Sequence, residues 1–85
     1  MSVNKVILIG NLGRDPELKH TQGSGPVCNL NIATSRKWKN KQSGEMVEEV
    51  EWHRVSVFGP QAEACERYLS KGKSVYVEGR IKTRE

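Results

Sequence analysis

The chain has 85 residues, a net charge of +4 and a pI of about 9.3. A chain of this length forms one domain with a small core, and such domains often gain stability by oligomerising. Hydrophobic residues make up 35% and charged residues 28%, which excludes a membrane-spanning or a disordered protein. Thirteen valines and isoleucines against five leucines favour strands over helices.

The positive charge is gathered in two blocks. Residues 1–43 carry a net charge of +5, residues 44–66 carry −5, and residues 67–85 carry +4. Such a basic, segregated pattern indicates a polyanionic partner. Lys5 interrupts the first apolar run and no cleavage site follows it, so no secretory signal is expected. A cytoplasmic, nucleoid-associated location with reduced cysteines is the expectation.

The apolar pattern predicts four strands and one helix. In chain order they are a strand over Val3–Leu12, a strand over Val27–Trp38, a strand over Val47–Phe58, a helix over Gln61–Leu69 and a strand over Ser74–Lys82. Asp15-Pro16 is expected to end the first strand. Helices do not alternate with the strands, which excludes a doubly wound α/β fold.

This order predicts an all-β fold with one short helix, specifically a Greek-key barrel of the OB class. A helix between the third and fourth strands is the usual layout of that fold, which has five strands. We therefore expect residues 1–85 to form a single OB domain, with the fifth strand missing from the chain.

A tryptophan among cations is the first candidate binding feature. Trp38 stands within a run of four basic residues, namely Arg36, Lys37, Lys39 and Lys41. Bases stack on indole rings, and basic side chains neutralise phosphates. A solvated charged hairpin with Trp38 folded onto the barrel explains the same pattern, and composition alone leaves both interpretations open.

The third predicted strand carries the second candidate feature. Trp52 and Phe58 share a parity with Arg54 and Ser56, whereas His53 shares the apolar parity of Val55 and Val57. Two large aromatic rings on a polar face favour a binding surface. A second buried face, against a helix or another subunit, is the alternative.

The sequence shows no complete enzymatic or metal-binding motif. Gly72-Lys73-Ser74 resembles the end of a phosphate-binding P-loop but lacks the earlier glycine, because Arg67 stands there. Cys28 and Cys65 show no zinc-ligand spacing and are expected to be structural thiols. No nucleophile stands beside a base, and no paired carboxylates stand out. We expect neither an enzyme nor a cofactor.

Several blocks of the chain closely resemble bacterial single-stranded DNA-binding proteins. The blocks are Val3–Gly13 with Asp15–Glu17, Gly44–Met46, Glu51–Val55 with Phe58-Gly59, Tyr68–Gly72, Val75–Gly79 and Thr83-Arg84. The resemblance implies an OB-fold that assembles as a homotetramer. It also implies that Trp38, Trp52 and Phe58 stack bases, and that His53 lies at a subunit contact. The basic residues expected to follow the DNA backbone are Arg36, Lys37, Lys39, Arg54, Lys71, Lys82 and Arg84.

The chain departs from this family after Arg84. Members continue with another aromatic residue, the fifth barrel strand and an acidic-tipped tail that recruits replication and repair proteins. We therefore expect the domain to be truncated at its C-terminal end, and protein partners only if a tail exists beyond this chain. The fifth strand lies between the third and fourth strands in an OB-fold, so both are expected to expose unpaired edges.

The function implied by this resemblance is sequence-nonspecific binding and protection of single-stranded DNA. It would serve replication, recombination and repair by base stacking and phosphate neutralisation. The main alternative is a primosomal OB protein that mainly bridges other proteins. The aromatic pair Trp52 and Phe58 favours strand binding.

Overall fold

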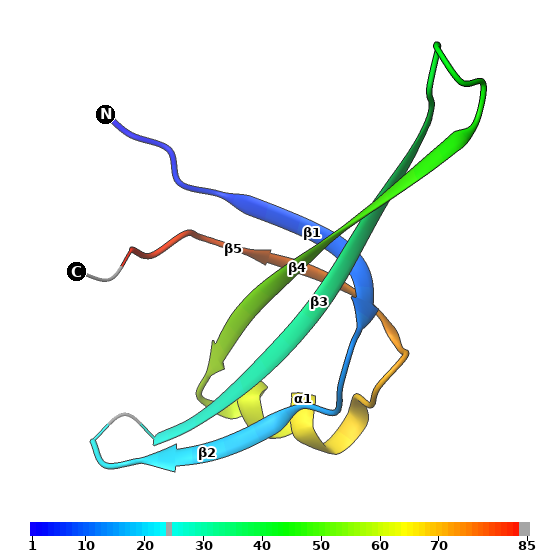
Figure 1. The fold of residues 1–85 in the computed structure, drawn as a ribbon. Coiled ribbons are helices and arrows are strands. Elements are labelled where there is room, and N and C mark those ends of the chain that lie inside the picture. Colours follow the sequence, from blue (N-terminus) through cyan, green and yellow to red (C-terminus); the bar gives the residue numbers. More distant parts are fainter. Residues whose placement is uncertain (24, 84–85) are drawn as a thin grey trace.

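The fold is built around one long strand, β3 (Gly25–Lys39). A computed structural model describes residues 1–23 and 25–83. The other elements are β1 (Val6–Leu12), β2 (Glu17–Thr21), β4 (Met46–Phe58), α1 (Pro60–Tyr68) and β5 (Ser74–Gly79) (Figure 1). The domain is mainly β with one short helix, as the sequence predicts.

All strand pairs are antiparallel. Along one edge, β3 pairs with β4 from Val27 opposite Phe58 to Lys39 opposite Met46. Along its other edge, β3 pairs first with β2 and then briefly with β1, and β1 continues into a pairing with β5. The sheet therefore curves across β3, and the distal part of the β3–β4 hairpin projects away from the other elements (Figure 1).

The strand β2 was not expected from the sequence. Its residues Glu17, Lys19 and His20 are polar and exposed, and Leu18 is its one half-buried residue. One apolar residue is too few to show the alternation that predicts a strand. Pairing of Leu18 with Cys28 places β2 on β3 despite its weak pattern. Asp15-Pro16 therefore separates two strands of one sheet, and the prediction of only four strands is wrong. At the other end, β5 is shorter than predicted and stops at Gly79.

The core lies between the concave side of the sheet and α1. Its buried residues are Leu12, Cys28, Leu30, Ile32 and Ala62. Burying an aliphatic side chain of this size contributes roughly 1.5–3 kcal/mol, so alternate residues of β3 supply much of the stabilisation. The helix lies across one end of the sheet and contacts β2, β3 and β4.

Local chain chemistry sets the ends of the helix. Pro60 occupies the first turn, where the missing N–H costs nothing. Gly59 precedes it at a φ of 76°, a left-handed conformation that glycine adopts without strain. The helix ends at Tyr68. Gly72 lies in the connection to β5 and donates its N–H to the Leu12 carbonyl at 2.8 Å.

The strands β4 and β5 each have an unpaired edge, as expected. Over residues 1–23 and 25–83, β4 pairs with β3 alone and β5 pairs with β1 alone. The sheet is thus open between these two strands. Within the same ranges, no helix is long and apolar enough to cross a membrane.

Candidate nucleic-acid interface

The β3–β4 ladder has two chemically distinct faces. Residues directly opposed in an antiparallel ladder point to the same side. Leu30 opposite Val55 and Ile32 opposite His53 lie on the core face. The other side, called here the outer face, is formed near the sheet by four opposed pairs. They are Val27 with Phe58, Asn29 with Ser56, Asn31 with Arg54 and Ala33 with Trp52.

The two aromatic residues of the outer face are solvent-exposed. Trp52 is 63% exposed and Phe58 is 62% exposed within this chain, so neither ring is buried against the helix. They are six positions apart in the sequence, or about 20 Å along a strand. Arg54 lies between them on the same face. Two stacking surfaces with a cation between them match the needs of a flexible, phosphate-linked chain of bases.

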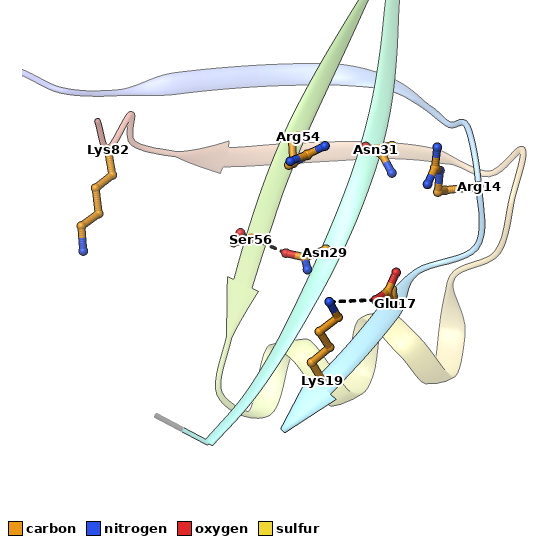
Figure 2. A pocket seen from close by; sticks show the side chains of 8 residues that line it. All are labelled: Arg14, Glu17, Lys19, Asn29, Asn31, Arg54, Ser56 and Lys82. Carbon is orange, nitrogen blue, oxygen red and sulfur yellow. Dashed lines mark hydrogen bonds and ion pairs between the residues drawn. The ribbon is translucent and has the colours of Figure 1, made fainter. Parts of the chain in front are cut away.

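A basic hollow adjoins these aromatic residues. It encloses about 580 Å³ and is lined by Arg14, Glu17, Lys19, Asn29, Asn31, Arg54, Ser56 and Lys82. Figure 2 shows Arg54 and Asn31 on the ladder, with Arg14 to one side and Lys82 to the other. Four basic side chains and one carboxylate line the hollow. The carboxylate, which belongs to Glu17, forms an ion pair with the ammonium of Lys19 at 3.1 Å. The net charge of the hollow favours an anion.

Neutral hydrogen-bonding groups form the floor of the hollow. The Ser56 hydroxyl donates to the Asn29 Oδ1 atom at 3.1 Å (Figure 2). The side-chain amide of Asn31 lies opposite Arg54 in the ladder. Amide groups both donate and accept hydrogen bonds, so they can meet any base edge or sugar oxygen. The hollow therefore combines charge with polar groups that do not demand one base.

Trp38 lies apart from the other two aromatic residues. It opposes Val47 in the ladder and shares the core face with His53, so it does not share the outer face of Trp52. Trp38 lies in the projecting half of the β3–β4 hairpin and is 39% exposed. The guanidinium carbon of Arg36 lies 4.7 Å from the centre of its ring. One side of the indole thus already contacts a cation.

Acidic residues of β4 pair with the basic residues of the hairpin. Arg36 lies 3.4 Å from the Glu49 carboxylate, and Lys37 lies 3.5 Å from that of Glu48. Lys39 is exposed near the tip. These ion pairs lower the charge available to phosphate, so the distal hairpin is a weaker anion site than the hollow.

The remaining predicted residues are placed as follows. Lys82 lines the hollow, whereas Arg84 lies outside the described residues. Lys71 is exposed next to the β1–β2 connection, where its backbone N–H donates to the Asp15 carboxylate at 2.8 Å. Half-buried His53 bonds the Thr34 hydroxyl through Nε2 at 2.8 Å. Its place at a subunit contact stays a prediction.

Six residues of the hollow had no role predicted from the sequence. They are Arg14, Glu17, Lys19, Asn29, Asn31 and Ser56. The alternation of Asn29 and Asn31 with the apolar residues of β3 already placed both on a polar face and could have identified them. Lys19 carried no such signal, because its position depends on the unexpected pairing of β2 with β3. Arg14 carried none either, since it lies in the connection between β1 and β2.

Both thiols belong to the interior. Burial raises the pKa of Cys28, with smaller contributions from the charges of Cys65 and Glu66. Burial also raises the pKa of Cys65. Over the described part of the chain, no group of three or more potential ligands could hold a metal ion. Cys28 is part of the core, and Cys65 packs against it.

Known proteins share this fold. Residues 3–85 match the model of the single-strand binding protein family. The SSB of Plasmodium falciparum, solved in complex with single-stranded DNA, is 34% identical, with a TM-score of 0.87 over 99% of this chain and 75% of that one. A deletion mutant of the single-stranded DNA-binding protein from Thermus aquaticus is 37% identical, with a TM-score of 0.84 over 98% of this chain and 40% of that one. The matches also establish the OB-fold, and the chain belongs to the single-strand binding protein family.

Proposed function

We propose that this protein binds and protects exposed single-stranded DNA with little regard to base sequence. The observation that carries the proposal is the exposure of Trp52 and Phe58 on one face, with Arg54 between them. Each stacked base contributes roughly 1–3 kcal/mol, and every base offers a π-face. Stacking therefore gives affinity without selecting a sequence.

The basic hollow supplies the second part of the affinity. Arg14, Arg54 and Lys82 surround it, and none of the three forms an ion pair among the described residues. Phosphates placed there would release condensed cations from the DNA, which makes binding depend on salt. Arg36 and Lys37 are held by glutamates and would have to exchange partners before they could contribute fully.

Similarity to known single-stranded DNA-binding proteins supports the proposed function. The Plasmodium falciparum SSB has been solved with single-stranded DNA, and its fold covers nearly all of this chain. We propose the general roles of the family for this protein, in replication, recombination and repair, as a non-catalytic binding protein in the cytoplasm. We also propose a homotetramer, with His53 at a contact between subunits.

A fluorescence titration with poly-thymidine at several salt concentrations tests the proposed function. Stacking on Trp52 should quench its emission, and the logarithm of affinity should fall with the logarithm of salt by about 0.7 per neutralised phosphate. Replacing Trp52 by leucine should weaken binding in every salt concentration. An unquenched protein with a salt-independent signal would contradict both stacking and phosphate neutralisation.

A further inference from the structure

Trp52 reaches across the sheet to Gly13. The indole starts on β4, opposite the small side chain of Ala33 on β3, and its far edge meets Gly13 in the connection after β1. A β-carbon at Gly13 would lie 2.6 Å from Cη2 of the indole and closer still to Cζ3. Real β-carbons essentially never approach an atom so closely, so only glycine fits this ring position.

The position of Gly13 is fixed by its neighbours. Its N–H donates to the Asn31 carbonyl at 2.9 Å, and the preceding Leu12 is buried in the core. Gly13 is not among the described glycines with a positive φ, so its backbone would accept alanine without strain. The requirement for glycine therefore comes from the indole alone.

The same contact borders a small hollow. It encloses about 300 Å³ and is lined by Gly13, Arg14, Asn31 and Trp52. The indole is 63% exposed, yet its edge is held at Gly13 beside a cation and an amide. An exposed side chain without such a support samples several rotamers, and ordering it on binding costs entropy.

We propose that Gly13 is a positioning residue for strand binding, which holds the Trp52 indole in the orientation that stacks a base. The inference rests on the proposed function. A side chain at position 13 would displace the ring from the sheet and from the hollow containing Arg14 and Asn31. Losing part of one stacked base should weaken binding about tenfold.

The test compares Gly13→Ala with Gly79→Ala. Gly79 also lacks a positive φ, and an added β-carbon there meets nothing within 4 Å, which makes it a matched control. Both variants carry Trp38→Phe, so that Trp52 is the only tryptophan. We expect Gly13→Ala to shift the emission of the free protein and to weaken oligothymidine binding about tenfold. Gly79→Ala should change neither.

A double-mutant cycle separates positioning from general destabilisation. In a Trp52→Leu background, which lacks the obstructed ring, Gly13→Ala should have little further effect on affinity. An equal loss in both backgrounds, or no difference between the two alanine variants, would overturn the inference. Thermal melts of every variant verify folding. If the parent itself fails to bind, the proposed function fails instead, while the shift in free-protein emission still tests the Gly13 contact.

Discussion

At the scale of single residues, the basic side chains of this domain differ in whether a carboxylate already pairs with them. Arg54 faces the basic hollow between two exposed aromatic rings, whereas Arg36 contacts both Glu49 and the Trp38 ring. Exposed ion pairs contribute only about 0–1 kcal/mol to stability, but they lower the charge that an incoming phosphate meets. For phosphate binding, the position of a basic residue relative to the acidic residues of β4 therefore matters more than the number of basic residues.

This difference predicts unequal effects of two arginine substitutions. Arg54→Ala should weaken oligothymidine binding strongly and reduce the salt slope by about 0.7, because one phosphate contact is lost. Arg36→Ala should have the smaller effect, since its charge is already balanced by Glu49. Titrations from low to moderate salt measure both slopes. Equal losses would show that the hairpin and the hollow contribute alike.

The buried thiol predicts a pH dependence of stability. Burial raises the pKa of Cys28, so the folded state holds the thiol proton more tightly than the unfolded state does. Its stabilisation is complete below the unfolded pKa of about 8.5 and is lost as pH rises through the higher folded pKa. Urea unfolding should show this alkaline decline, and Cys28→Ala should reduce it. A decline of the same size in the variant would assign the effect to other groups.

At the scale of elements, alternation in the sequence predicted the faces of β4 correctly. Val55 and Val57 pack on the core and Trp52 is exposed, because a strand projects successive side chains to opposite sides. The strand β2 could not be predicted in this way, since its place comes from hydrogen bonds to β3. The contact between Gly13 and Trp52 could not be predicted either, because 38 residues lie between them in the sequence and only the folded sheet brings them together.

The opposite ladder faces of Trp38 and Trp52 predict a dependence on DNA length. A short strand that lies on the outer face can stack on Trp52 without reaching Trp38, which lies on the other face of the hairpin. With each tryptophan retained alone through Trp→Phe substitution of the other, about four nucleotides should quench Trp52 only. About sixteen nucleotides, the upper range for one OB domain, should quench both. Quenching of Trp38 by the shortest oligomer would contradict separate engagement.

The ion pairs of the hairpin predict a gain of affinity on neutralising one glutamate. Glu49→Gln frees Arg36 and should tighten strand binding about two- to threefold at low salt, with the difference fading at high salt. Glu63→Gln on α1 changes the net charge equally and is the control, because Glu63 has no ion pair among the described residues. Equal gains would indicate a general charge effect rather than release of Arg36.

At the scale of the whole molecule, the described chain is elongated. Its radius of gyration is 15.9 Å, whereas a compact domain of 85 residues has about 12 Å. The projecting β3–β4 hairpin contributes to this elongation (Figure 1). Ile7, Ile9 and Tyr76 are exposed together where β1 pairs with β5, so apolar surface remains uncovered. A small core with uncovered apolar surface favours association with further copies.

Self-association should therefore be measurable at micromolar protein and should depend on His53. This residue is half-buried, opposes Ile32 and bonds Thr34, so a long cation at its position would stay poorly solvated against a neighbouring subunit. Sedimentation velocity should show an assembly for the parent and dissociation for His53→Lys. His20→Lys, the same exchange at an exposed residue of β2, should leave the assembly unchanged. Circular dichroism verifies that each variant is folded. A parent that sediments as a monomer would contradict the assembly, and equal behaviour of the two lysine variants would remove His53 from the contact.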